Sequence, residues 1–156
     1  MPHIHERCDF VVSAFIVHEN KVLLIHHKTY NEWLPIGGHV ELDEDPEEAL
    51  YREIQEECGL KVNLLCKAPD IGHEGVKPLP SPHFMDSHRI SDTHRHVAFV
   101  FFGKSASNDV RLHEKEHFEY RWVGEHELDD PSLALIKSIR FYCAEALKAA
   151  LESGKN

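Results

Sequence analysis

Apolar runs in the first part of the chain predict a pair of buried strands. Residues 9–18 contain the run FVVSAFIV, rich in β-branched and aromatic side chains, which is typical of a buried strand. After the turn residues Glu19 and Asn20, the segment 21–27 (KVLLIHH) is predicted to return as its partner. Residues 33–36 (WLPI) then lead to two glycines. Paired glycines let the backbone approach a ligand closely.

The pattern then changes to a helical period. Asp45 is the predicted N-cap, Pro46 suits the first helical position, and Glu48 stands where a capping box places an acid. Gly59 suits the position just past the helix end, where a positive φ is needed. At about 100° per residue, one apolar stripe contains Leu50, Ile54 and Cys58, flanked by Tyr51.

Three glutamates fall on the neighbouring face of this helix. Glu53, Glu56 and Glu57 stand at the i, i+3 and i+4 positions that meet on one helical turn, with only the small Ala49 between them. Each pair of carboxylates ~4 Å apart repels by about 4 kcal/mol at an effective dielectric constant near 20. Within the predicted helix, no Lys or Arg follows four residues after any of them, so no cationic partner is expected at helical spacing. The cluster is therefore predicted either to bind a hard divalent cation or to be a solvated acidic face.

The remaining pattern predicts more strands and a closing helix. Residues 68–93 have four prolines and no clear period, and so long a loop is usually functional or mobile. The regular elements are predicted at 60–67, 94–104 and 120–123 for strands and 131–152 for a helix, with a charged loop at 111–119. This order favours one domain over residues 1–156 with an α/β fold, in which a mixed sheet lies between helices.

Composition excludes several classes of protein. With 27 acidic against 17 basic residues, the net charge of −10 argues against binding of duplex nucleic acid. The four cysteines are widely spaced, which argues against a zinc cluster or a disulfide framework and favours a reducing compartment. The N-terminal stretch MPHIHERCDF lacks the pattern of a signal peptide, and no apolar run has the length of a membrane span. We expect a cytoplasmic protein with no membrane partner.

The spacing around the acidic helix resembles a known family motif. The pattern Gly38-x5-Glu44-x7-Arg52-Glu53-Ile54-x-Glu56-Glu57-x-Gly59-Leu60 is similar to the complete box of the Nudix (MutT-like) hydrolases. The box covers residues 38–60, and the family fold would occupy nearly all the rest. The resemblance implies a Nudix-type α/β/α sandwich and an Mg²⁺-dependent pyrophosphohydrolase, with Mn²⁺ as a substitute. The implied substrate is a nucleoside diphosphate linked to another group, with water attacking phosphorus.

The resemblance also implies roles for residues of the box. Glu53, Glu56 and Glu57 would bind the metal, with the carbonyl of Gly37 as a backbone ligand. One of these glutamates would accept the proton of the attacking water, and which one stays open. Arg52 is expected to hold a glutamate in place through a bidentate contact rather than to contact substrate.

Further site residues are expected outside the box. Relatives often supply one more acid from a loop ahead of a Trp-containing strand. Glu116 is the predicted residue for catalysis and metal binding, with Glu114 and Glu119 as rivals. The predicted contacts to a phosphate or base are His94 and His96, which alternate on one strand face, together with His39 after the glycines and Arg89 in the long loop.

The resemblance leaves the substrate and the assembly open. The residues that divide the family by substrate are not evident after the box, and Pro78-Leu79-Pro80-Ser81-Pro82 is only superficially like the proline-rich array of the NADH-type enzymes. An alternative is a ligand sensor of the same fold without turnover. Such regulators usually carry a DNA-binding module or a damaged box, and this sequence has neither, so an enzyme is favoured. A homodimer and the role of the 14 histidines also stay open.

Overall fold

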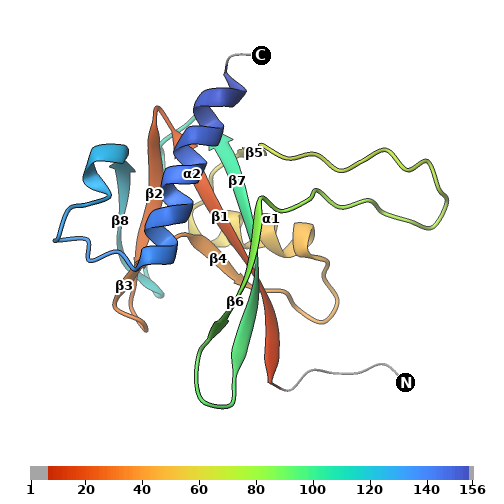
Figure 1. Ribbon diagram of the computed structural model, residues 1–156, viewed down its shortest axis with the longest axis horizontal. Coiled ribbons are helices and arrows are strands. Elements are labelled where there is room, and N and C mark those ends of the chain that lie inside the picture. The colour runs from red at the N-terminus through yellow and green to blue at the C-terminus, as the bar shows by residue number, and fades with distance from the viewer. Residues whose placement is uncertain (1–6, 155–156) are drawn as a thin grey trace.

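Strand β1 (Cys8–His18) is the central strand of the computed structural model, which describes residues 7–154. Its side chains alternate between two hydrophobic cores. Phe15 and Val17 pack toward helix α2 (Lys137–Ser153), whereas Ala14 and Ile16 pack toward helix α1 (Pro46–Glu57). The predicted buried strand is thus confirmed, and it is apolar on both faces because a helix covers each face (Figure 1).

The sheet is mixed, as predicted. β1 pairs in parallel with β7 (Arg95–Ser105), and every other pairing is antiparallel. One edge of β1 is shared by β2 (Lys21–His27) and β4 (Ile36–His39). The outer strands are β3 (Glu32–Leu34), β5 (Val62–Leu64), β6 (Phe84–Arg89) and β8 (His117–Gly124), and a short 3-10 helix, η1 (Glu125–Glu127), follows β8.

Helix α1 begins and ends as the sequence predicts. The Asp45 side chain accepts hydrogen bonds from the Glu47 and Glu48 amides, and the Glu48 carboxylate accepts one from the Asp45 amide. Gly59 follows with φ of 64°, a conformation that favours glycine. The predicted apolar stripe is buried against the sheet, which fixes the side of α1 that carries the glutamates.

The second helix starts six residues later than predicted. The residues after Pro131 form turns, in which Asp130 accepts a hydrogen bond from the Ser132 amide at 2.8 Å and Ala134 has φ of 46°. These local contacts compete with helix formation, so α2 begins only at Lys137.

The predicted loop 68–93 divides into two parts. The stretch after β5 first extends away from the sheet and returns to it at His83, whose amide donates to the carbonyl of Val100 at 2.8 Å, whereas β6 pairs with β7 over its whole length (Figure 1). The predicted strand 60–67 is shorter than expected and forms only β5.

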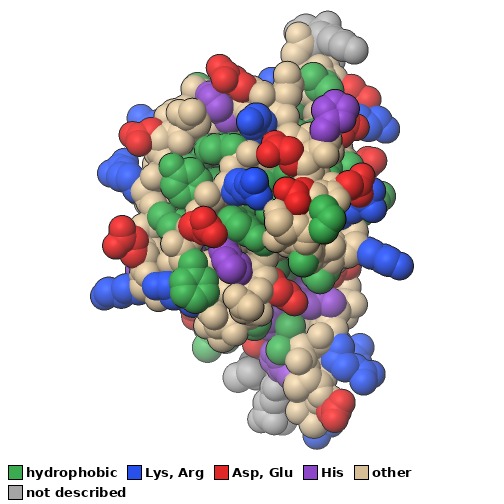
Figure 2. Space-filling model, turned by 90° about the vertical axis from the view of Figure 1, so that its left-hand side faces the viewer, with side chains coloured by type: hydrophobic (Ala, Val, Ile, Leu, Met, Phe, Trp, Pro, Cys, Tyr) green, Lys and Arg blue, Asp and Glu red, His purple; other side chains and the backbone are tan. Residues whose placement is uncertain are grey.

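The surface carries charges of both signs. The face on the β8 side shows acidic, basic and hydrophobic side chains intermixed (Figure 2). Neither helix within residues 7–154 has the length and apolar character needed to cross a membrane. The expectation about a signal peptide concerns mainly residues 1–6, which lie outside the described part of the chain.

Candidate active site

A pocket of about 780 Å³ opens between the start of the sheet and the acidic side of α1. Its acidic side contains Glu53 and Glu57 from α1 and Glu116 from the loop before β8. Its basic side contains His39, His88, His96 and Arg89. Both glycines that precede the box loop, Gly37 and Gly38, line it as well. The pocket thus brings these carboxylates together with imidazoles and a guanidinium, and Glu32, Glu41 and Asp86 line it as well.

Glu57 is buried rather than exposed, with 4% of its surface accessible. Its Oε2 accepts a hydrogen bond from the Gly37 amide at 2.8 Å, and its Oε1 lies 3.0 Å from Nε2 of His117. The alternative of a solvated acidic face is therefore wrong for Glu57. The helix packs on β4 and β1, and its last acidic residue points into the protein toward Gly37 of β4 and His117 of β8.

Glu53 lies beside the glycine that opens the box. A Cβ atom on Gly38 would stand 2.1 Å from Oε1 of Glu53, so the absence of a side chain makes room for this carboxylate. Burial raises the pKa of Glu53, the nearby Glu57 and Glu56 carboxylates raise it further, and the hydrogen bond from Arg52 opposes the rise. A cation at this place would relieve the burial and repulsion.

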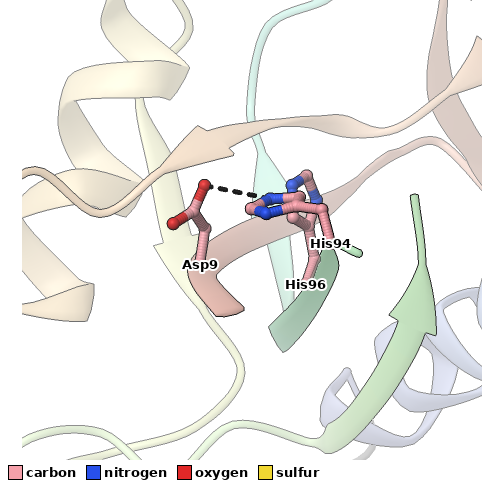
Figure 3. A group of neighbouring side chains, drawn as sticks. All are labelled: Asp9, His94 and His96. Carbon is pink, nitrogen blue, oxygen red and sulfur yellow. Dashed lines mark ion pairs between the residues drawn. The ribbon is translucent and has the colours of Figure 1, made fainter. Parts of the chain in front are cut away.

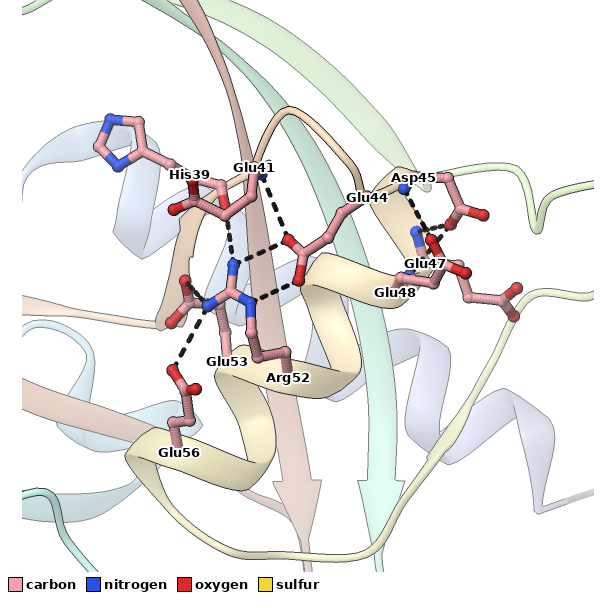
Figure 4. Close-up of polar contacts among 9 residues, drawn as sticks. All are labelled: His39, Glu41, Glu44, Asp45, Glu47, Glu48, Arg52, Glu53 and Glu56. Atoms are coloured by element: carbon pink, nitrogen blue, oxygen red, sulfur yellow. Dashed lines mark hydrogen bonds and ion pairs between the residues drawn. The ribbon is translucent and has the colours of Figure 1, made fainter.

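Arg52 ties the box loop to the helix (Figure 4). Its Nε and Nη2 donate to the two carboxylate oxygens of Glu44 at 2.6 and 3.0 Å, and Nη2 also donates to the carbonyl of His39 at 2.9 Å. Its Nη1 donates to Glu53 at 2.7 Å and reaches Glu56 at 3.3 Å. The bidentate contact expected of Arg52 exists, but its partner is Glu44 of the loop.

This network corrects the expectation that the glutamates lack a cation at helical spacing. Arg52 precedes Glu56 by four residues, so the pair has the reverse order of the favoured acid-first arrangement. The hydrogen bonds that Arg52 donates to Glu44, the larger effect, and to Glu53 raise the pKa of Arg52, and those to Glu44 lower the pKa of that carboxyl. Arg52 is therefore a fixed positive charge that orients two of the three glutamates.

Glu116 meets the acidic helix from a separate element. Ligand atoms of Glu116, Glu57 and His117 all lie within 4.8 Å of one another. Glu116 remains 54% exposed and lines the pocket, whereas neither Glu114 nor Glu119 does. The structure thus brings Glu116, and not its two rivals, to the carboxylates of α1.

Only some of the residues predicted to contact substrate line the pocket. His39 and His96 line the pocket, and Arg89 lines it with a side chain that is 78% exposed. His94 instead points to Asp9, whose Oδ2 lies 3.1 Å from its Nε2, and it is absent from the pocket wall (Figure 3). Burial lowers the pKa of His96 to about 4, helped by the neighbouring histidines His39, His88 and His94.

Sequence reasoning missed His117, the buried partner of Glu57. Its side chain is fully buried, and although Nε2 is close to Glu57, neither ring nitrogen has a hydrogen bond of good geometry. The period of two that runs back from the buried Val123 gives no signal for His117, because Arg121 and Glu119 on that period are exposed. The pairing of β8 with β2 shifts register between His26 and His27, so the burial of His117 does not follow the alternation of the strand. Asp9 was missed as well. It directly precedes the apolar run of its strand, and nothing in the local sequence links it to the distant histidines.

The donor set on the acidic side fits a hard divalent ion. Oxygen ligands of Glu53, Glu57 and Glu116 surround one side of the pocket, and Glu56 stands next to them on the same helix. Mg²⁺ and Mn²⁺ prefer such carboxylate oxygens. The buried imidazole of His117 without a hydrogen bond is a further group that a bound ion would help to satisfy.

Comparison with known proteins finds a matching family model and a solved structure of the same fold. A family model described as "NUDIX domain" matches residues 9–143. A crystal structure of a NUDIX-family hydrolase from Clostridium perfringens is 33% identical, with a TM-score of 0.79 over 90% of this chain and 96% of that chain.

Two curated relatives carry pyrophosphohydrolase names. A "CTP pyrophosphohydrolase" from Escherichia coli is 31% identical over 58% of this chain and 73% of its own length. A "Probable DHNTP pyrophosphohydrolase" from Lactococcus lactis is 27% identical over 68% of this chain. The match spans only 60% of the length of the Lactococcus protein.

Proposed function

The chain belongs to the NUDIX family of hydrolases, and on that premise we propose that it is a metal-dependent pyrophosphohydrolase acting on a nucleoside diphosphate linked to another group. The observation that carries the proposal is the meeting of Glu57 and Glu116 from two separate elements in one pocket. Carboxylates that converge from two sides can hold a cation against a diphosphate, whereas a solvated acidic face has no need of such convergence.

Glu53, Glu56, Glu57 and Glu116 would hold Mg²⁺ or Mn²⁺, with the carbonyl of Gly37 as a backbone ligand. When bound, such an ion supplies positive charge to the diphosphate oxygens and favours attack by water. Glu57 is positioned for this role by the Gly37 amide, which leaves its other oxygen beside His117 and Glu116. Arg52 acts as a positioning residue that fixes Glu53 and Glu56 through its hydrogen bonds.

The proposed reaction is a substitution at phosphorus. The oxygen of water forms a bond to one phosphorus, and the bond from that phosphorus to the bridging oxygen breaks. The proton of water passes to a carboxylate of the cluster, and the bridging oxygen leaves with the second phosphoryl group. A nucleoside monophosphate is one product. Glu116 is exposed enough to exchange protons with solvent, and its carboxylate lies close to Glu57.

The opposite side of the pocket would contact the rest of the substrate. His39 and His96 face the pocket, and Arg89 adds a cation at its rim. His94 would act in the same region through its contact with Asp9. We expect a small-molecule substrate handled in the cytoplasm, in keeping with the free thiols of Cys8, Cys58, Cys66 and Cys143.

A substrate panel tests the proposal. The purified chain is incubated with Mg²⁺ and nucleoside diphosphate derivatives, together with CTP and DHNTP, the compounds for which the two curated relatives are named. Phosphate is then measured after phosphatase treatment. Turnover that needs Mg²⁺ supports the proposal. Binding of panel members without any turnover contradicts it and favours a sensor of the same fold.

A further inference from the structure

The sheet register places three metal-ligating residues in one row. Asp9 of β1 lies directly opposite His96 of β7, and His96 lies directly opposite His88 of β6. Side chains of directly opposed residues point to the same face of a sheet. The row Asp9–His96–His88 is therefore a consequence of the strand pairing and does not depend on a flexible loop.

Two more imidazoles join this row. His94 precedes His96 by two residues, and its Nε2 lies 3.1 Å from Oδ2 of Asp9. His39 at the end of β4 places its own Nε2 3.6 Å from the same oxygen. The ring of His96 has its centroid 4.9 Å from that of His39, 5.2 Å from that of His94 and 5.5 Å from that of His88. We call these five residues the histidine cluster.

The geometry of the cluster meets the first requirement of a metal site. Ligand atoms of Asp9, His94 and His96 all lie within 4.8 Å of one another (Figure 3). Small side-chain movements would bring them around one ion at the usual bond lengths of about 2.0–2.2 Å. His94 and Asp9 are partly exposed, so an ion can enter from solvent. His96 is buried, so its ring is held in place by the surrounding residues.

We infer that Asp9, His94 and His96 bind a divalent transition-metal ion of the zinc class, with His39 as an adjacent donor. Two imidazoles and one carboxylate are ligands that zinc uses in proteins, whereas Mg²⁺ prefers oxygen donors throughout. A single Asp–His ion pair would need only one of these imidazoles, and it does not account for the gathering of the others around the same carboxylate. The site is separate from the carboxylates of α1, and it does not rest on the proposed hydrolysis.

His39 connects the two sites physically. Its carbonyl accepts a hydrogen bond from Arg52, which orients the α1 glutamates, while its ring faces Asp9. Three protein ligands leave an open coordination position on zinc. Since His39 and His96 line the pocket, that position would face the pocket, which is compatible with their proposed contacts to substrate.

Metal binding by the whole chain tests the inference. Chelator-treated protein is titrated with Co²⁺ in the presence of saturating Mg²⁺, and the visible absorption of the bound Co²⁺ is recorded. Calorimetry with Zn²⁺ gives the stoichiometry. We expect one tight ion per chain. Loss of an outer-shell partner typically weakens metal binding by about 10- to 100-fold. The variants Asp9→Asn and His94→Asn remove a direct ligand, so each should weaken binding of the ion by at least that factor.

Two control variants locate the ion. Glu56→Gln alters the acidic helix and should leave Co²⁺ binding unchanged. A double substitution, His3→Asn with His5→Asn, tests the N-terminal residues that lie outside the described part of the chain, and it should also leave binding unchanged. Absence of tight binding under excess Mg²⁺ overturns the inference. So does tight binding that Asp9→Asn and His94→Asn do not weaken, or that the His3 and His5 substitutions abolish.

Discussion

Nε2 of His117 lies 3.0 Å from Oε1 of Glu57, and both side chains are buried. The contact joins the first residue of β8 to the last residue of α1. Buried carboxylates are expected to have partners, and the Gly37 amide satisfies only the other oxygen of Glu57. His117 is therefore a positioning residue for the acidic cluster, although it lies outside the box.

Replacing His117 should impair metal binding. We expect His117→Leu to lower kcat/KM by about 10- to 100-fold, the usual cost of losing an outer-shell partner, and to reduce the rise in Tm that Mg²⁺ causes. His117→Gln, whose amide can reach the place of Nε2, should lose less. The exposed His126→Asn is the matched control and should behave as wild type. A normal response to Mg²⁺ in His117→Leu would contradict this role.

Glu116 should matter more than its neighbours. We predict that Glu116→Gln lowers kcat by about 10- to 1000-fold with little change in KM, since one good electrostatic contact is worth ~1.4–4 kcal/mol in the transition state. Glu114→Gln should be mild and Glu119→Gln intermediate at most, because neither side chain reaches the pocket. Steady-state kinetics decides between them. A near-normal kcat for Glu116→Gln, together with a strongly reduced kcat for Glu114→Gln or Glu119→Gln, would mean that one of those acids has the role proposed for Glu116.

The segment 68–93 should affect substrate choice only where it reaches the pocket, at residues 86–90. Arg89→Ala removes an exposed cation from the pocket rim and should change the ratio of kcat/KM between substrates by about fivefold, or ~1 kcal/mol. Shortening the exposed stretch 70–76, which does not line the pocket, is the control. In both variants the Tm rise with Mg²⁺ should persist. Its loss on shortening would place this stretch in the catalytic core.

Acid should destabilise the metal-free protein through His96. Its pKa falls from 6.5 to about 4 on folding, because burial and the imidazoles of the histidine cluster disfavour the cation, although Asp9 opposes this. Above pH 6.5 the residue is neutral in both states. As the pH falls from 6.5 toward 4, the unfolded chain takes up a proton that the folded protein resists, so stability is lost. The loss is at most about 3 kcal/mol.

Urea unfolding with a chelator at about pH 7.5 and about pH 4.5 measures this loss. The variant His96→Gln should lose less stability between the two pH values than wild type. His73→Gln removes an exposed histidine and should lose as much as wild type. An identical pH dependence in wild type and His96→Gln would rule out His96 as the source.

Local chemistry made α1 predictable to the residue. The cap at Asp45, the buried stripe through Leu50 and the positive φ of Gly59 all depend on neighbours within one or two turns. The predicted start of α2 was wrong, also for a local reason. The turn that Asp130 makes with Ser132 outweighs the helical tendency after Pro131.

The site was predictable only in part because burial depends on distant elements. Helical spacing alone puts Glu57 beside Glu53, but its contacts come from β4 and β8. The histidine cluster is even harder to predict from the sequence pattern. Asp9 and His96 are 87 residues apart, and only the parallel pairing of β1 with β7 brings them together. Pairings of this kind cannot be deduced from a single sequence by periodicity.

The central claim is that the carboxylates of α1 hold the metal at which a diphosphate is hydrolysed. The most direct test compares wild type with Glu57→Gln for hydrolysis of the best panel substrate and for the Tm rise caused by Mg²⁺. Because Glu57 is buried, the exposed Glu56→Gln serves as a second variant that should fold normally. We predict that both variants lose turnover and most of the Mg²⁺-induced stabilisation. Equal turnover and equal stabilisation in wild type and both variants would contradict the account.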